Sequence, residues 1–568
     1  MRDEIEFGER APAGDDVQGA DAAQLPANIA FIAASALTLA ACGSGGASPT
    51  PSPTPTAAAP APPTSMQVGR LLSQATMGAT DADIARVQSL GYAGWVDEQL
   101  AKPRATTHWD WMIAKGYGGP ANTSDLTGFD ATIWRQLISG DDQLRQRVGL
   151  ALSEILVVAA NGLETTYPQF MAAAYLDVLW DNAFGSFRTI LQQLSTNMAM
   201  GEWLTFMSSR KADPATGSMP DENYARELMQ LFTIGLVQLN MDGTVKTNGG
   251  VPIETYTQDD ILGLARVFTG YIPSTWDATS ASIDRNRQPM ITRDDWYETG
   301  AKTFLGTTIP AGTDAAASLM AALDAIFAHS NVPPFISKQL IQRLVTSNPT
   351  PAYVGRVAAV FADNGSGVRG DLKAVVRAIL LDSEARDDTI ATGVSFGKLR
   401  EPIMRLTNWA RAFGVASPSD AWAIGDTSNT TTKLGESPGR SPSVFNFYRP
   451  GYTPPSTAIQ AQGLVAPEFQ IASELTTVGY INYMNSLIVN GVGDVKPNYA
   501  DLVAKAADSS ALIDAINVRL AGGQLSAATI ATIKSAIDSI SATGANGPIN
   551  RVTTAILLTM ATADYLVQ

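Results

Sequence analysis

The sequence predicts an all-α protein, a mainly helical multi-helix globular array, and the chain after residue 64 supplies the observations that indicate this class. Apolar residues recur at the i, i+3 and i+4 spacing of amphipathic helices in most segments of this region. Segments such as 81–91 start at Asp and stop at Gly, the residue types that commonly begin and end helices. Strand signals are few, so sheets contribute little to the expected fold.

The expected helices follow one another along the chain, and residues 172–207 hold two of them, broken near Gly185. They lie in residues 68–78, 81–91, 141–162, 172–207, 337–347, 352–365, 370–385, 500–523, 526–541 and 549–566. In 370–385 one buried face is formed by Leu372, Val375, Val376, Ile379 and Leu380. In 141–162 the apolar side is formed by Leu144, Val148, Leu152, Ile155 and Leu156. We expect Arg145, Arg147 and Glu154 to lie away from that side.

Two segments of the body depart from the helical pattern. Asp242 and Gly243 stand between alternating stretches, which predicts a short β-hairpin near residues 236–256. A calcium loop is disfavoured there because the remaining acidic ligands and the closing Glu are missing. Residues near 426–457 are rich in Pro, Gly, Ser and Asn and predict a long irregular loop, which we expect its aromatic residues to pin to the body. These are Phe445, Phe447, Tyr448 and Tyr452.

Composition and charge exclude several classes of function. The 568 residues carry a net charge of −15, which repels the phosphates of nucleic acids. One Cys and two His rule out an internal disulfide and any Cys- or His-based metal site, so we expect no metal and no cofactor. A metal-dependent redox enzyme would need an all-carboxylate site. His108 and His329 are interpreted as helix-end or surface residues.

The amino-terminal region has the pattern of an export signal. Residues 27–41 form an uncharged apolar run of signal-peptide length, ending Leu-Ala-Ala before Cys42, which resembles the lipobox of bacterial lipoproteins. That resemblance implies an exported chain lipidated on Cys42. Residues 43–64 predict an extended tether. The stretch before the apolar run is acidic where signal peptides are basic, so the true start could lie elsewhere.

These features divide the chain into a signal and lipobox segment (1–42), a tether (43–64) and one large helical domain (65–568). Whether 500–568 forms a C-terminal helical subdomain is left open. The expected location is the cell envelope, anchored by lipid. If the cell is Gram-negative, Gly43 lacks the Asp that marks inner-membrane retention, which favours the outer membrane.

A polar stripe lies on the helix expected after Pro220. Asn223, Arg226 and Glu227 share one face at i, i+3 and i+4, and Glu222 with Arg226 forms a favourable i, i+4 pair. Taken alone, this is a solvated helix face. In the following segment Thr257 and Asp260 have the spacing of a capping box, so Asp260 is interpreted as a cap partner rather than a catalyst.

Segments 220–235 and 256–271 are similar to the signature of the bacterial family called domain of unknown function 1800, and seven further segments agree with it in order. The resemblance implies an exported, mainly helical protein whose gene often stands beside that of an exported protein resembling sulfatases and alkaline phosphatases. It points to no established activity. Asn197 and Phe232 stand where some members carry His, so no metal role of those histidines applies here.

The resemblance gives the polar stripe a definite pattern, which a buried ionic network or a binding site would explain better than a solvated face. Such a network persists only when it is fully paired. Its candidate members are Asn223, Arg226, Glu227, Arg145, Arg147, Lys398, Arg400, Glu401, Asn446 and Arg449.

Two functions remain from the sequence. The first is an uncharacterised lipid-anchored protein of the cell envelope that is non-catalytic and acts as scaffold or partner of another exported protein. The alternative is a carboxylate-dependent hydrolase of an envelope or extracellular polymer such as polysaccharide, with Glu222, Glu227 and Asp259 as catalytic candidates. The implied partners are the membrane, through the lipid anchor, and the sulfatase- or phosphatase-like neighbour.

Overall fold

The computed structural model describes residues 62–274 and 282–568. The expected signal segment, Cys42 and nearly all of the expected tether lie outside the described residues. Residues Ala61–Gln568 form one compact unit. Within the described residues there are 24 α-helices and three antiparallel two-stranded sheets, so the predicted helical fold class is confirmed.

The helices before residue 231 are α1 (Ser65–Ala75), α2 (Asp81–Ala101), α3 (His108–Ala114), α4 (Phe129–Ser139), α5 (Gln143–Ser153), α6 (Pro168–Asp181), α7 (Phe187–Ser195), α8 (Met198–Trp203) and α9 (Asn223–Gln230). The middle of the chain holds α10 (Gln258–Ala265), α11 (Ala315–Ala328), α12 (Val332–Leu344), α13 (Pro351–Ala362), α14 (Leu372–Leu381), α15 (Ser383–Arg386), α16 (Asp388–Ala391) and α17 (Pro402–Ala412). The last helices are α18 (Ala458–Ala461), α19 (Glu474–Asn490), α20 (Ala500–Val503), α21 (Ser509–Ala521), α22 (Ala527–Asp538), α23 (Gly547–Ala561) and α24 (Ala563–Leu566).

The strands are short and pair with their neighbours in the chain or across a loop. They are β1 (Thr247–Asn248), β2 (Val251–Pro252), β3 (Tyr271–Ile272), β4 (Ile291–Thr292), β5 (Lys302–Phe304) and β6 (Thr307–Ile309), paired β1 with β2, β3 with β4 and β5 with β6. The predicted hairpin near 236–256 is confirmed: Gly243 turns the chain with φ 78°, and backbone bridges join Leu239 to Val245 and Val237 to Glu254.

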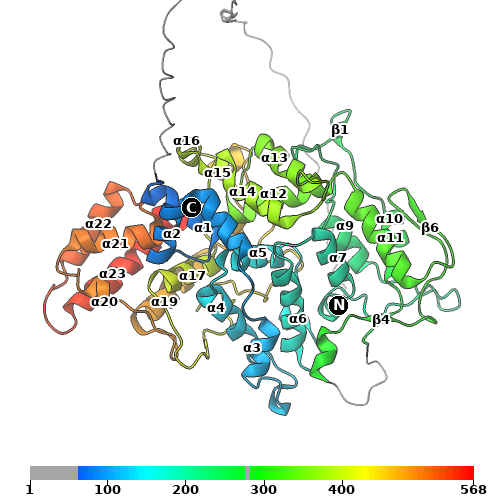
Figure 1. The fold of residues 1–568 in the computed structure, drawn as a ribbon, viewed down its shortest axis with the longest axis horizontal. Helices are drawn as coiled ribbons and strands as arrows, with labels where there is room; N and C mark the ends of the chain where they lie inside the picture. Colours follow the sequence, from blue (N-terminus) through cyan, green and yellow to red (C-terminus); the bar gives the residue numbers. More distant parts are fainter. Residues whose placement is uncertain (1–61, 275–281) are drawn as a thin grey trace, which may run out of the picture. The chain divides into compact units, whose positions relative to one another are not determined.

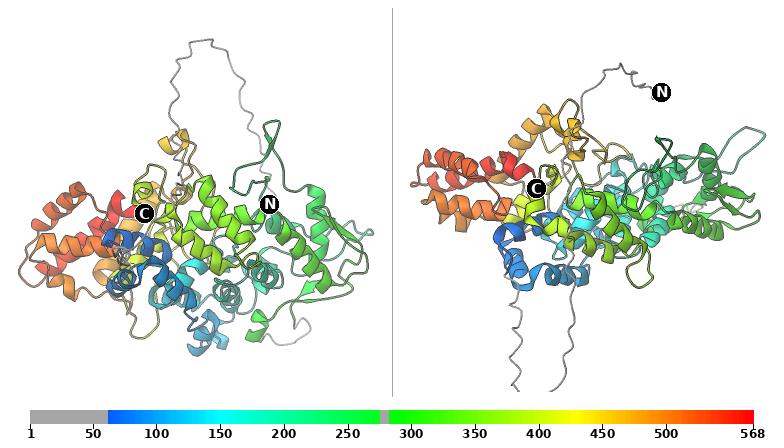
Figure 2. Two further views of the ribbon diagram at one scale, coloured as in Figure 1. Left: turned by 45° about the horizontal axis from the view of Figure 1, so that its top comes forward. Right: turned by 90° about the horizontal axis from the view of Figure 1, so that it is seen from above.

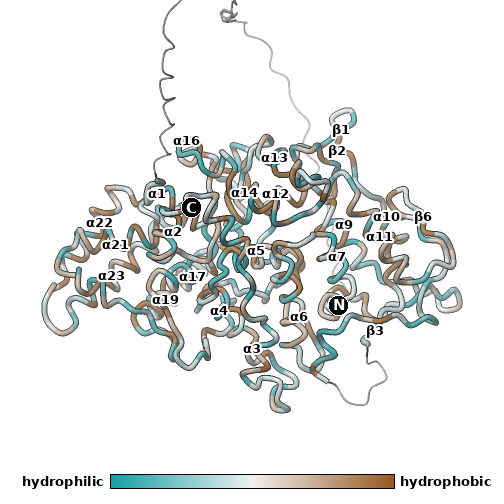
Figure 3. Tube along the Cα trace, in the orientation of Figure 1, coloured by the Kyte–Doolittle hydropathy of each residue, from teal (hydrophilic) through white to brown (hydrophobic). Residues whose placement is uncertain are grey.

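Within the compact unit, the α20–α23 helices lie at one end and α10 and α11 at the other, with α5, α12 and α14 between them (Figures 1 and 2). The central helices carry hydrophobic stretches (Figure 3). The buried face predicted for residues 370–385 is confirmed on α14, whose Val375 and Ile379 are fully buried. Asp371 begins this helix by accepting hydrogen bonds from the backbone N–H groups of Lys373 and Ala374.

Helix α5 differs from its expectation in one respect that matters for the site. The prediction placed Arg147 and Glu154 off the apolar side, but both are buried, 0% and 5% exposed. The physical reason is that α5 packs against other helices on nearly every side, including α6, α2 and α12. Gln143, Gln146 and Gly149 are buried on it as well.

The predicted loop near 426–457 is confirmed as irregular, since no helix or strand of the described chain falls between α17 and α18. Both histidines lie at helix ends as expected: His108 begins α3 and His329 follows the last residue of α11. His108 is fully buried beside Trp180 rather than on the surface, and this burial lowers its pKa well below the usual value.

Membrane-spanning helices were also sought. Within residues 62–274 and 282–568, no single helix is long and apolar enough to cross a membrane; α11 and α12 meet the criteria of length and composition only as a pair, bent by 74°.

Candidate functional site

The polar stripe of α9 is a partly exposed contact with α10. Arg226 Nη2 lies 3.0 Å from Glu222 Oε2, and the Gln258 amide donates to the same carboxylate at 2.7 Å. Asn223 Nδ2 donates to Thr205 Oγ1 at 3.4 Å. Asp259 is exposed, and Asp260 closes the expected capping box with Thr257. The stripe is therefore held by local polar contacts.

Glu227 is the one buried member of the stripe, 8% exposed. Burial raises the pKa of its carboxyl group, and the nearby Arg226 lowers it to a smaller extent. Its Oε2 atom accepts no hydrogen bond within the described residues. Nearby on the same helix, Gln230 accepts a hydrogen bond from the Tyr256 hydroxyl at 3.0 Å.

The structure does not join the stripe to the other residues predicted to belong to its network. Arg145 pairs with Asp142 at 3.2 Å, and Asn446 accepts from Ser441 at 3.0 Å within its own loop. Arg449 is exposed and stacks over Phe445. In the described part of the chain, none of these side chains forms a hydrogen bond or ion pair with the stripe.

Four other predicted members, Arg147, Lys398, Arg400 and Glu401, are buried elsewhere, and three of them meet in the core. We call the set around them the central charge cluster. It consists of Arg147, Glu154, Arg343, Lys398, Glu401, Glu436, Tyr448 and Glu468, all 0–5% exposed. These residues come from α5, α12, the start of α17, the 426–457 loop and the turn at Pro467–Gln470.

The α5 side of the cluster is bound to α12 by two arginines. Arg147 donates from Nη2 to the carbonyl oxygen of Arg343, and Arg343 donates to the Glu154 carbonyl oxygen at 2.9 Å. Arg343 Nε also lies 3.5 Å from Glu154 Oε2. Tyr448 from the loop donates its hydroxyl to the same carboxyl oxygen at 3.1 Å, which pins the loop as expected.

Lys398 forms the centre of the other side. Its Nζ lies 3.0 Å from Glu401 Oε1 and 2.9 Å from Glu468 Oε1, and it donates to the Arg343 carbonyl oxygen at 2.8 Å. Three donors of an ammonium group are thus matched by three acceptors. Such a geometry offsets the desolvation of the buried charges, because every proton of the cation has a partner.

The carboxyl groups of Glu154 and Glu401 lie close enough to shift each other's pKa, and one oxygen of each is buried with no other polar partner in the described residues. Burial and the Glu401 charge raise the pKa of Glu154 to about 8, whereas Lys398 and Arg147 oppose desolvation and hold the pKa of Glu401 at about 2. At neutral pH the pair therefore holds one proton, on Glu154, as expected for two carboxyls forced together.

Glu436 lies near the Glu154–Glu401 pair and binds the backbone at the start of α17. Its Oε2 accepts from the backbone N–H of Ile403 at 3.1 Å, in the first turn of that helix. Burial raises its pKa well above the usual value, and the neighbouring Glu401 and Glu154 add to the shift. The sequence did not single out Glu436, Glu468 or Arg343, because each stands in a segment that gives no charge pattern of its own, and it marked Tyr448 only as an aromatic residue of the loop.

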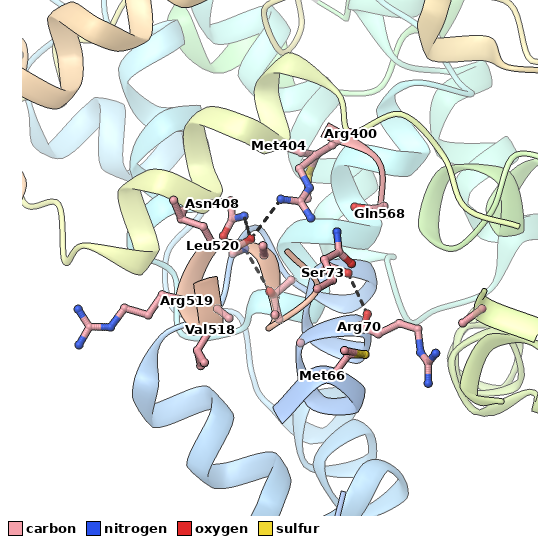
Figure 4. Close-up of a pocket in the computed structure, with 18 of the residues that line it drawn as sticks. Met66, Arg70, Ser73, Arg400, Met404, Asn408, Val518, Arg519, Leu520 and Gln568 are labelled. Carbon is pink, nitrogen blue, oxygen red and sulfur yellow. Dashed lines mark hydrogen bonds between the residues drawn. The ribbon is translucent and has the colours of Figure 1, made fainter. Parts of the chain in front are cut away.

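Arg400 faces away from the cluster, into a cavity of about 300 Å³ between α1, α17 and α21 (Figure 4). Its Nη1 donates to the Leu520 carbonyl oxygen at 3.3 Å, and its guanidinium lies 4.4 Å from the centre of the Tyr565 ring. Within the described residues no three His, Cys, Asp or Glu side chains are grouped so that they could hold a metal ion.

Comparison with known proteins gives one family. The chain matches no curated protein and no solved structure. Residues 70–567 match the model of the family described as protein of unknown function (DUF1800), so the match covers the whole helical unit except its ends. The chain therefore belongs to the DUF1800 family of proteins.

Proposed function

We propose that this chain is a lipid-anchored, non-catalytic scaffold of the bacterial cell envelope that binds another exported protein. One observation carries the proposal: the Glu side chains with the most displaced pKa values are buried in the core, where Glu154, Glu401 and Glu468 lie within ion-pair distance of Arg343 or Lys398 and Glu436 accepts from the Ile403 N–H. Glu154, Glu401, Glu436 and Glu468 are 0–5% exposed. Groups in this state hold helices together, and a polymer has no way to reach them.

The cavities also support a non-catalytic role. Among five of the cavities in the described residues, one of about 200 Å³ borders the cluster, at Glu468. Ligand sites usually measure about 300–1,000 Å³, so this space is small for a segment of polysaccharide. The catalytic candidates Glu222, Glu227 and Asp259 line none of these five cavities.

The anchor and the partner come from the sequence. An apolar run ending at Cys42 and a charge-free tether support lipidation and display at a membrane surface. The partner that we propose is the exported protein resembling sulfatases and alkaline phosphatases, whose gene is expected beside this one. A scaffold with a 22-residue tether (residues 43–64) could hold such an enzyme near the membrane.

The test compares the full chain with a Cys42→Ser variant in the native bacterium. We expect the wild-type chain to fractionate with membranes, to incorporate labelled palmitate and to crosslink to the sulfatase-like protein. The Cys42→Ser chain should lose the label and the membrane association. A wild-type chain that stays unlabelled and forms no crosslink to that protein would overturn the proposal.

A hydrolase is the second candidate, and Glu227 is the observation that favours it. Its carboxyl has a raised pKa while Glu222, on the preceding turn, is held in an ion pair with Arg226. A carboxyl group whose pKa is raised by burial suits the role of a general acid. Purified chain should be assayed on polysaccharides, and turnover lost in Glu227→Gln with unchanged thermal stability would establish this candidate instead of the scaffold.

A further inference from the structure

The cavity beside Arg400 has the size and lining of a small-molecule site. Its volume of about 300 Å³ corresponds to roughly ten water-sized groups of ~30 Å³ each. Its walls come from α1, the segment after it, the start of α17, the end of α21 and the last residue, Gln568. Apolar residues make up much of this lining, among them Met66, Phe396, Met404 and Val518. No Asp or Glu of the described chain lines it.

Arg400 is the one cation that points into this space (Figure 4). The residue is 4% exposed, yet its guanidinium has no carboxylate within ion-pair distance in the described residues. Its hydrogen bond to the Leu520 carbonyl oxygen uses Nη1 alone. Within the described residues Nε and Nη2 have no acceptor and are not fully buried, so they offer donors to the cavity.

The other two arginines of the lining point away from the cavity (Figure 4) and are already paired. Arg70 forms an ion pair with Asp388, and Arg519 forms ion pairs with Asp81 and Asp501. They do not compete for a ligand. A buried cation without a counter-ion is unfavourable, so an anion that entered the cavity would gain the whole interaction with Arg400.

A second donor faces the same region. Gln568 lines the cavity, and its Nε2 atom is buried without a hydrogen-bond acceptor in the described residues. Asn408 is committed to the Leu520 carbonyl oxygen at 3.0 Å, and Ser73 donates to the Arg70 carbonyl oxygen at 2.9 Å. The cavity therefore holds an unpaired guanidinium and a free amide, and Met66, Phe396, Met404 and Val518 supply its apolar surface.

We propose that this cavity binds an organic monocarboxylate with an unbranched apolar body, the carboxylate on Arg400 and the body along Met66, Phe396 and Met404. Two parallel N–H groups of a guanidinium match the two oxygens of a carboxylate. The apolar walls would bury the hydrocarbon part of the ligand. The site is independent of the scaffold role and of the anchor at Cys42.

The test is isothermal titration of the full chain with sodium octanoate, whose ten non-hydrogen atoms match the cavity by the estimate above of roughly ten water-sized groups. Octanol and octylammonium carry the same chain with a neutral and a positive head group. Saturable binding of octanoate is expected, at least about tenfold weaker binding of octanol, and none of octylammonium. Inorganic phosphate, which lacks the apolar body, should not bind.

Two variants assign the binding to this cavity. Arg400→Gln should weaken octanoate binding by at least about tenfold. Ser73→Phe should abolish it by filling the space while Arg400 remains. Arg551→Gln is the matched control, because Arg551 is also buried, at 7%, and donates to backbone carbonyls but lines none of the five cavities. Octanoate that does not bind the wild type, or binds all three variants equally, would overturn the proposal.

Discussion

Replacing Glu154 and Glu401 separately by Gln should give opposite results, although the two carboxyls touch. Glu154 is the protonated member of the pair at neutral pH, so an amide at that position keeps a neutral side chain that donates to Glu401. We expect Glu154→Gln to change the free energy of unfolding at pH 6 by less than about 1 kcal/mol. Glu401→Gln removes the charge that faces Arg147 and one of the two carboxyl groups bound by Lys398, and we expect a loss of about 3–5 kcal/mol.

The pH dependence of the free energy of unfolding tests the same protonation states independently. A pKa raised in the folded state means that the folded protein keeps a proton that the unfolded chain releases, so stability falls as pH rises toward that pKa. With a folded pKa of about 8 for Glu154, wild type should lose about 2–3 kcal/mol between pH 6 and pH 9 from this group. Glu154→Gln should lack that component. Glu401, whose pKa is lowered, acts in the opposite window, losing its contribution as pH falls toward about 2.

The assay is urea unfolding of wild type and both variants at pH 6, 7.5 and 9, followed by circular dichroism, with the analysis made on differences between variant and wild type. Other titrating groups of the cluster, such as Glu436 and Glu468, cancel in those differences to first order. The reasoning is refuted if Glu154→Gln is as damaging as Glu401→Gln at pH 6. It is also refuted if the difference between Glu154→Gln and wild type does not change with pH.

Two further perturbations test the packing and the stripe. A Cβ placed on Gly69 would lie 2.4 Å from the Gly522 Cα, so Gly69→Ala should lower the free energy of unfolding in urea by about 1–3 kcal/mol. The control Gly451→Ala, which has open space around it, should change it by no more than about 0.5 kcal/mol. Equal effects of the two substitutions would show that α1 and α21 do not meet this closely. Arg226→Ala should lower the free energy of unfolding by less than about 0.5 kcal/mol, because solvent screens its ion pair with Glu222: the Arg226 side chain is 39% exposed and that of Glu222 31%. A loss above about 2 kcal/mol would mean that the stripe is a buried network.

The sequence was sufficient for those parts of the fold that depend on local patterns. The face of α14, the hairpin at Asp242-Gly243, the capping box at Thr257 and the irregular loop follow from spacing, turn chemistry and composition. Each is decided by residues within a few positions of one another, where helix and strand periodicity and turn preferences operate.

The central charge cluster depends on contacts between distant segments, and periodicity carries no information about those. Arg147 meets Arg343 across 196 residues, and Glu154 meets Tyr448 across 294. On a helical wheel a buried Arg looks like a solvated one, so periodicity predicted only that Arg147 lies away from the apolar side of α5. The polar stripe of α9 was predicted to belong to a buried network because of its dense charge pattern. In the structure its side chains pair with near neighbours and stay partly exposed. Burial of a charge becomes visible only once its partner is known.

The most direct test of a binding rather than catalytic role is equilibrium binding of the full chain to the exported sulfatase-like protein that we propose as its partner. The chain, lipidated on Cys42 and held in lipid nanodiscs, would be titrated with the purified sulfatase-like protein while hydrolysis of polysaccharide by the chain alone is followed in parallel. The account predicts saturable binding with a dissociation constant of about 1 μM or lower, and no hydrolysis. Absence of binding, together with hydrolysis that Glu227→Gln removes, would contradict it.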